Sequence, residues 1–117
     1  MSDSILREPT FLILTALAGG RRHGYAIIAE VAALSEQRVS LKVSTLYAAL
    51  ERLTEQELIE SAGDEVVGGR LRRYYRITNS GAQALNQAAQ RMSNSANAAL
   101  TRLQERGSRL GEAVTGA

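Results

Sequence analysis

Four arginines within seven residues are the feature of this sequence that most directly indicates chemistry. They lie between Arg70 and Arg76, in a stretch without an acidic residue. Guanidinium groups with an interleaved aromatic ring suit contacts with phosphate groups and with a narrow minor groove. The alternative is a solvated edge strand protected by charge. The residues predicted here to bind nucleic acid are Arg70, Arg72, Arg73 and Tyr74.

A second group of polar side chains lies at the start of a predicted helix over residues 43–56. It offers an ammonium group, two hydroxyls and a phenol, from Lys42, Ser44, Thr45 and Tyr47. The free N–H groups of a helix N-terminus favour phosphate, and short hydroxyls reach base edges. Capping by the two hydroxyl residues and packing of the tyrosine ring are the structural alternatives.

The composition argues against most enzyme classes. The 117 residues include no cysteine and one histidine, His23. These counts remove disulfides, iron–sulfur clusters and cysteine nucleophiles, and they leave no set of ligands for a zinc site. We therefore expect no catalytic residue, no metal and no cofactor. The apolar run over residues 11–17 is too short to span a membrane, and the N-terminus lacks the pattern of a signal peptide. A soluble, cytoplasmic domain is expected.

The pattern of apolar residues predicts three short helices followed by a β-hairpin. The first helix has Pro9 in its first turn and Gly19 and Gly20 at its end, although a buried strand is the competing interpretation. Glycines at 63 and at 68–69 mark the hairpin turn. This is a mainly α protein with a small β-hairpin, the arrangement of a winged helix-turn-helix. The predicted helices cover residues 10–18, 23–34 and 43–56, and the strands cover residues 58–61 and 70–78.

A long last helix is predicted over residues 79–106, with Thr78 as its N-cap. Its apolar residues alternate at spacings of four and three, as in a coiled-coil seam. Such a seam needs a second copy of the chain, so this helix is expected to form a homodimer. The seam residues are Leu85, Ala89, Met92, Ala96, Ala99 and Leu103. The expected organisation is a DNA-binding domain over residues 1–78, a dimerisation helix over 79–106 and a flexible tail over 107–117.

Five motifs in order resemble the PadR family of bacterial transcriptional regulators, over roughly residues 9–105. The single C-terminal helix is similar to the short-form members. The motifs are His23–Ile27, Ser44–Leu50 with Arg52–Leu53, Leu58–Glu60, Gly69–Arg70 and Tyr74–Gly81.

The resemblance implies a repressor that binds an inverted-repeat operator in double-stranded DNA as a homodimer. A small-molecule inducer is a candidate signal for release of the protein from the operator. The alternative is a winged-helix protein-interaction module without sequence-specific DNA binding. Such a module would tolerate exposed apolar residues beside Lys42 and the hairpin, and none is expected there.

The same resemblance implies roles for individual residues. Tyr47 stands where family members commonly contact the DNA backbone. His23, Gly24 and Tyr25 form a structural start to the second helix, where Tyr25 packs or touches a phosphate. Alternation along the second predicted strand, and not the resemblance, places Tyr75 on the core face with Leu71 and Ile77 and leaves Tyr74 as the better candidate for solvent or DNA.

A candidate inducer site is implied around Met92. Drug-sensing family members carry a tryptophan at this point, and this chain has none, but methionine also lines adaptable apolar pockets. The alternative is close helix packing without a cavity. The implied ligand-binding residues are Ala89, Met92 and Ala96, with Phe11 and Glu8 facing them.

Two residues depart from the family pattern. Lys42 stands where a capping serine or asparagine is usual, which loses a cap worth about 1 kcal/mol. Glu57 stands where glycine is usual, and a left-handed conformation there costs roughly 1 kcal/mol.

Overall fold

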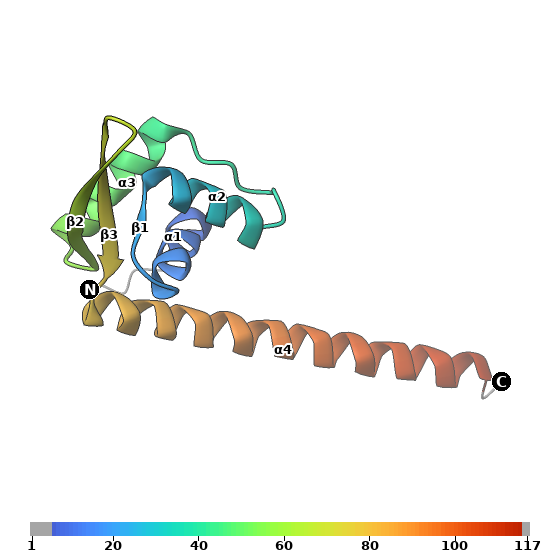
Figure 1. The fold of residues 1–117 in the computed structure, drawn as a ribbon. Coiled ribbons are helices and arrows are strands. Elements are labelled where there is room, and N and C mark those ends of the chain that lie inside the picture. The colour runs from blue at the N-terminus through green and yellow to red at the C-terminus, as the bar shows by residue number, and fades with distance from the viewer. Residues whose placement is uncertain (1–5, 116–117) are drawn as a thin grey trace. The chain divides into compact units, whose positions relative to one another are not determined.

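The computed structural model describes the backbone of residues 6–115 and the side chains of residues 6–111. The chain divides into two compact units, Met1–Asn86 and Gln87–Ala117. The first unit holds three helices and a sheet, followed by the first turns of the last helix (Figure 1). The second unit contains the rest of that helix.

The three predicted helices are present as α1 (Glu8–Ala18), α2 (Gly24–Leu34) and α3 (Val43–Glu55). Pro9 lies in the first turn of α1, where its missing N–H costs nothing. Apolar side chains from all three helices and from the first residue of β2 form one core. The largest fully buried members are Ile13, Leu14, Leu17, Ile27, Val31, Leu46, Leu50, Leu53 and Ile59.

The sheet has three antiparallel strands in the order β1–β3–β2, so the predicted two-stranded hairpin is incomplete. Strand β1 (Arg22–His23) pairs with β3 (Arg70–Ile77) through Arg22 opposite Tyr75 and His23 opposite Tyr74. A strand of two residues is too short to show an alternating sequence pattern, so β1 could not be predicted. It is recognised only by its pairing with β3. Tyr75 and Ile77 pack against the core, as expected for that face of β3.

Strand β2 (Ile59–Val67) is longer than predicted. The predicted turn around Gly63 is wrong, because an irregularity between Ser61 and Asp64 lets the pairing continue. A β-bulge absorbs extra residues without ending a strand. The reversal occurs instead at Gly68 and Gly69, whose φ angles of 59° and 79° suit glycine in a two-residue turn.

Helix α4 (Asn79–Thr115) continues beyond the predicted end at Arg106. Gly107 does not stop it, because a glycine in a helix interior costs only about 1 kcal/mol relative to alanine. Leu110 and Arg109, which follow, are good helix formers. Residues 116–117 of the predicted tail lie outside the described residues.

Helix α3 ends in a Schellman motif. The Leu58 N–H donates to the Leu53 carbonyl at 3.0 Å, and the Glu57 N–H donates to the Thr54 carbonyl at 2.9 Å. Glu57 has a φ of 60°, which confirms the left-handed conformation expected at this position. The chain thus turns sharply out of α3 into β2.

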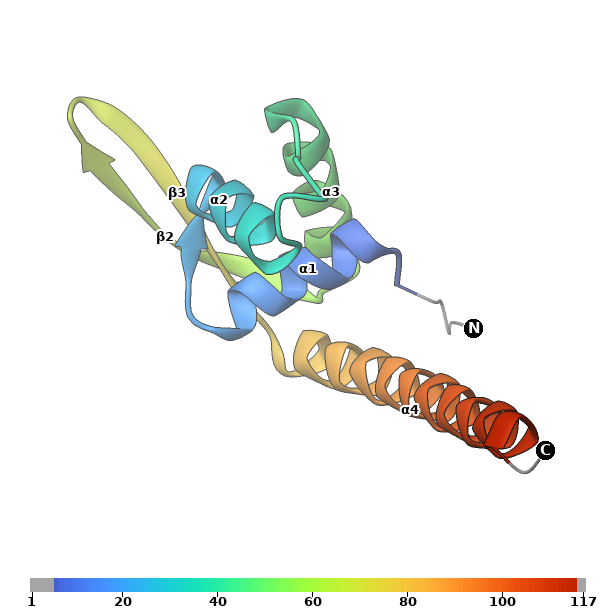
Figure 2. The same ribbon diagram turned by 90° about the vertical axis from the view of Figure 1, so that its right-hand side faces the viewer.

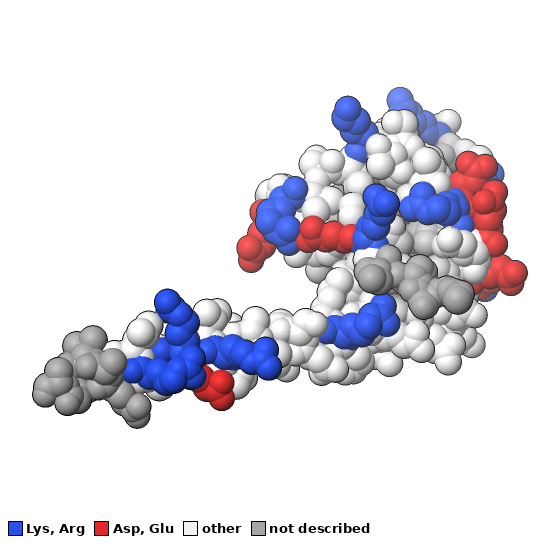
Figure 3. Space-filling view, turned by 180° about the vertical axis from the view of Figure 1, so that it is seen from behind, with Lys and Arg blue, Asp and Glu red and all other residues white. Residues whose placement is uncertain are grey.

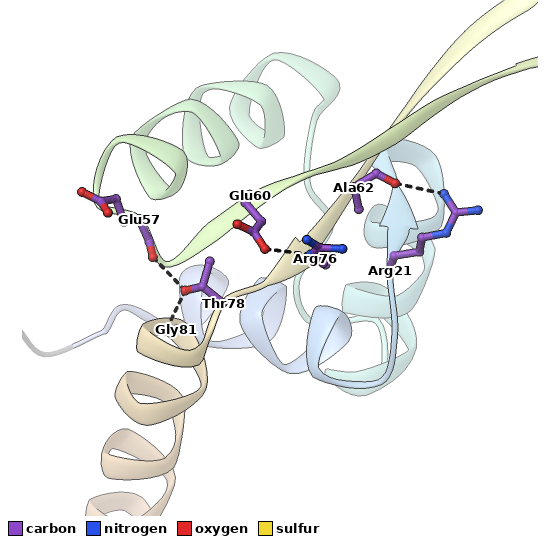
Figure 4. A network of polar contacts seen from close by, with 7 residues as sticks. All are labelled: Arg21, Glu57, Glu60, Ala62, Arg76, Thr78 and Gly81. Carbon is purple, nitrogen blue, oxygen red and sulfur yellow. Dashed lines mark hydrogen bonds and ion pairs between the residues drawn. The ribbon is translucent and has the colours of Figure 1, made fainter.

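Thr78 joins this turn to the start of α4 (Figure 4). Its hydroxyl donates to the Glu57 carbonyl at 2.7 Å and accepts from the Gly81 N–H at 3.0 Å, which confirms it as the N-cap of α4. Its own N–H donates to the Leu58 carbonyl at 3.0 Å. A Cβ atom on Gly81 would collide with that same carbonyl oxygen, so the two segments are in direct backbone contact.

We predict that Gly81→Ala lowers the free energy of unfolding by about 1–3 kcal/mol, because the added methyl group forces the α3–β2 turn and the start of α4 apart. Gly107→Ala is the matched control on the same helix. Its Cβ atom would meet open space, so we expect a gain of up to about 1 kcal/mol from helix propensity. Urea unfolding followed by circular dichroism measures both. Equal effects of the two variants would contradict the close approach at Gly81.

Candidate nucleic-acid interface

The first turn of α3 presents polar groups to solvent. Lys42 is the N-cap residue, and no side chain caps the helix, as its sequence predicts. The four predicted residues at this end, Lys42, Ser44, Thr45 and Tyr47, are all exposed. The opposite side of the helix is buried through Leu46, Ala49, Leu50 and Leu53. Because the hydroxyl residues do not cap, the first amide groups of α3 and both hydroxyls face solvent together.

Tyr47 lies across the boundary between α3 and α2. A Cβ atom built on Gly24 would be 2.6 Å from the Tyr47 Oη atom, so the phenol rests directly on the first residue of α2. The side chain nevertheless keeps 45% of its surface exposed. Tyr47 is therefore half-exposed at the junction of α2 and α3, with its hydroxyl against Gly24.

Tyr25, in the first turn of α2, is 64% exposed. Of the two roles expected for Tyr25, packing or contact with a phosphate, this exposure favours the second. Its neighbour His23 has the expected structural role, because the His23 Nδ1 atom accepts from the Ala26 N–H at 3.4 Å as the N-cap of α2.

The turn of the wing, formed by β2 and β3, lies at the same end of the first unit as the start of α3. Figures 1 and 2 both place the β2–β3 turn and the first turn of α3 at this end. Basic side chains project from it in the space-filling view (Figure 3). The two groups of residues that the sequence predicted separately are therefore on one side of the domain.

Acidic residues on β2 neutralise part of the wing. Asp64 pairs with Arg73 at 3.5 Å, and Glu60 pairs with Arg76 at 2.7 Å (Figure 4). These acids are far from the arginines in sequence, so the acid-free stretch of β3 overstates the positive charge. Arg70 and Arg72 have no acidic partner within 4.0 Å among the residues that the structure describes.

Tyr74 occupies the base of the wing. The Arg21 guanidinium carbon lies 4.1 Å from the centre of its ring, and the His23 ring meets it edge-on at 5.4 Å. Its hydroxyl donates to Glu65 Oε1 at 2.7 Å, and this hydrogen bond raises the pKa of Tyr74. Arg21, His23 and Glu65 therefore occupy the ring and the hydroxyl of Tyr74. Arg70 and Arg72, which have no acidic partner, lie between Tyr74 and the turn.

Apolar side chains are also exposed on the wing. Val66 and Leu71 form a cross-strand pair and are 69% and 62% exposed. The expectation that no apolar residue is exposed on this surface is therefore wrong. The inward face of the hairpin extends past the last helix that would cover it, so its alternating apolar positions meet solvent.

Some of the residues predicted for dimerisation and inducer binding are exposed, and others pack against the core of the first unit. Met92 and Leu103 are exposed large apolar side chains on α4, whereas Leu85 packs against the core of the first unit. Phe11 is partly buried against that same core. The Glu8 carboxylate is paired with Arg38 at 2.9 Å, which raises the pKa of Arg38.

Among the side chains of residues 6–111, no cluster of three or more histidine, cysteine or acidic groups could hold a metal ion. No helix in the described part of the chain is long and apolar enough to cross a membrane.

A model of the transcriptional regulator PadR-like family matches residues 13–87. The chain belongs to this family. PadR-like proteins are transcription regulators, not enzymes. An uncharacterized protein of Lysinibacillus sphaericus is 35% identical over 86 residues, which are 74% of this chain and 79% of that protein.

Solved structures of PadR proteins have the same fold. A PadR family transcription regulator from Clostridium difficile is 30% identical with a TM-score of 0.68, over 83% of this chain and 99% of that one. Bacillus subtilis PadR, solved in complex with operator DNA, is 29% identical with a TM-score of 0.61. That match covers 69% of this chain and 46% of the Bacillus protein. The mainly helical winged-helix fold with a long C-terminal helix is thereby confirmed.

Proposed function

We propose that this protein is a bacterial repressor that binds an inverted-repeat DNA operator as a homodimer in the cytoplasm. The observation that carries the proposal is the shared end of the first unit, where the uncapped start of α3 and the unpaired arginines of the wing face solvent together. A winged helix that binds DNA needs these two elements on one side. The operator complex of Bacillus subtilis PadR supports the assignment.

Each group at this end suits a part of the duplex. Helix α3 enters the major groove, with Ser44 and Thr45 toward base edges and Lys42 toward a phosphate. Tyr47 donates its hydroxyl to the DNA backbone. Arg70 and Arg72 reach a phosphate or the adjacent minor groove from the wing. Arg73 contributes less, because Asp64 already neutralises it.

The apolar positions of α4 support the homodimer. Large side chains such as Met92, Leu100 and Leu103 are exposed on this helix, and a second copy would bury them. A two-fold axis would place two α3 helices on successive major grooves, roughly 34 Å apart, and would require an inverted repeat in the DNA.

The exposed pair of Val66 and Leu71 favours one alternative function, a module that binds a protein through the wing. An electrophoretic mobility shift with the DNA that flanks the protein's own gene separates the two functions. A sequence-specific shift supports the repressor. Binding that is weak and equal for all sequences supports the module.

We predict that Arg70→Ala with Arg72→Ala weakens DNA binding and reduces the slope of log K against log salt by about 2, because each arginine releases counterions on binding a phosphate. The control is Arg73→Ala with Arg76→Ala, whose arginines are held by Asp64 and Glu60, so its slope should change by less than about 1. Fluorescence anisotropy at several salt concentrations gives both slopes. A slope and an affinity that stay at the wild-type values in the Arg70→Ala with Arg72→Ala variant would remove these arginines from the interface.

For the dimer, we predict that Ala96→Glu is monomeric at micromolar concentration, because an unpaired carboxylate in the seam loses its hydration. Ala98→Glu, on another side of the same helix, should remain dimeric. Sedimentation velocity distinguishes the two species. A monomeric wild type, or a dimeric Ala96→Glu variant, would contradict the seam.

We further propose that an inducer binds against Ala89, Met92 and Ala96 at the dimer centre. We predict that Met92→Trp binds a planar cationic dye about tenfold more tightly than the wild type, because stacking adds about 0.5–1.5 kcal/mol per aromatic pair. Dye fluorescence titration measures both affinities. Absence of binding to either protein would mean that the seam is closely packed and has no ligand site.

A further inference from the structure

Acidic residues of β2 lie directly opposite arginines of β3 at three places in the wing. Side chains that face each other across antiparallel strands are close enough to form an ion pair. Two of the three opposed pairs do so, at 2.7 Å for Glu60 with Arg76 (Figure 4) and at 3.5 Å for Asp64 with Arg73. At the third place, Glu65 faces Arg72, and no ion pair within 4.0 Å joins these two described residues. Opposition across the strands alone therefore does not decide which arginines are neutralised.

A neighbouring hydroxyl engages the carboxylate that faces Arg72. Tyr74 lies two residues from Arg72 on β3, so both side chains project from the same face of the sheet. The Tyr74 hydroxyl donates to Glu65 Oε1 at 2.7 Å. This hydrogen bond is the main reason why the pKa of Tyr74 is raised, and the nearby Arg72 guanidinium opposes the rise. The phenol oxygen is thus near both charged groups, and the carboxylate binds the tyrosine instead of the arginine.

The ring of Tyr74 is held by residues of the segment that precedes α2. The Arg21 guanidinium carbon lies 4.1 Å from the ring centre, and His23, its partner across β1 and β3, meets the ring edge-on. Arg21 is itself tied to β2, because its side chain donates to the Ala62 carbonyl at 3.3 Å (Figure 4). A ring with neighbours on its face and at its edge has few other rotamers. The hydrogen bond to Glu65 therefore orders a side chain that is already held in place.

We propose that Tyr74 is a positioning residue for DNA binding, whose hydroxyl holds Glu65 so that Arg72 remains available to a phosphate group. The inference rests on the proposed function, in which Arg72 meets the duplex. A carboxylate paired with Arg72 would compete with that phosphate and cancel a positive charge near the turn. A phenol prevents this without a charge of its own, because it satisfies the carboxylate as a neutral donor.

Tyr74→Phe tests the proposal, because it removes the hydroxyl and keeps the ring. Glu65 should then turn to Arg72, and DNA binding should weaken by about two- to fivefold at low salt, since an exposed ion pair must first be broken. The slope of log K against log salt should fall by up to about 1. Addition of Glu65→Gln should restore both values, because an amide has no charge with which to hold the arginine. Fluorescence anisotropy with a duplex from the DNA that flanks the protein's own gene measures them.

Two controls belong to this experiment. Glu65→Gln alone measures the general effect of removing one negative charge, and its gain in affinity should be smaller than the gain in the Tyr74→Phe background. Tyr75→Phe removes the phenol of the next residue, which packs against the core, and should leave the slope unchanged. Equal gains from Glu65→Gln in both backgrounds overturn the positioning role. A tyrosine that touched DNA directly, or that only supported the wing, would give that result.

The protein without DNA separates failure of this inference from failure of the proposed function. The NMR signal of the Arg72 Nε–H group reports whether a carboxylate pairs with this side chain. Glu65→Gln should move the signal clearly in the Tyr74→Phe protein and only slightly in the otherwise unchanged one. Equal movement in both proteins overturns the inference, whether or not DNA binds. The expected NMR result without any DNA binding by the wild type overturns the proposed function instead, and with it the role toward a phosphate.

Discussion

The hydrogen bonds of Thr78 connect the three parts of the molecule on which its proposed activity depends. After the Schellman motif at the end of α3, the carbonyl groups of Glu57 and Leu58 lie beyond the reach of the helix. Thr78 satisfies both, with its hydroxyl and its N–H respectively, and the same hydroxyl caps α4. The turn after α3, the residue that follows β3 and the start of α4 thus share one small network. A side chain at Gly81 would destroy it.

The wing is less positive than its arginines imply, and the reduction is selective. Cross-strand acids hold Arg73 and Arg76, whereas Arg70 and Arg72 have none within ion-pair distance among the described residues. The two arginines that have acidic partners link β3 to β2, and the two without such partners lie nearest the turn. Tyr74, enclosed by Arg21 and His23, anchors the same hairpin to the start of α2.

The sequence predicts well those features that depend on neighbouring residues. The buried stripe of α3, its uncapped start at Lys42 and the cap at Thr78 follow from spacing and side-chain chemistry over a few positions. The features it misses depend on partners distant in the chain. Strand β1 exists because β3 lies beside it, and the ion pairs of the wing arise only when β2 folds against β3. The exposure of Tyr25 and Leu71 depends on where the core ends, which local periodicity does not encode.

Strand β2, with nine residues, is the longer edge strand of the sheet, and the hairpin that it forms with β3 projects past the helices (Figure 2). A long free edge with an exposed apolar pair is a template for pairing with the edge of another molecule. The irregularity between Ser61 and Asp64 interrupts this edge, and Asp64 and Glu65 place negative charge along it. The acids that reduce the wing's positive charge are therefore also charges on its open edge, a feature that opposes edge-to-edge pairing of sheets.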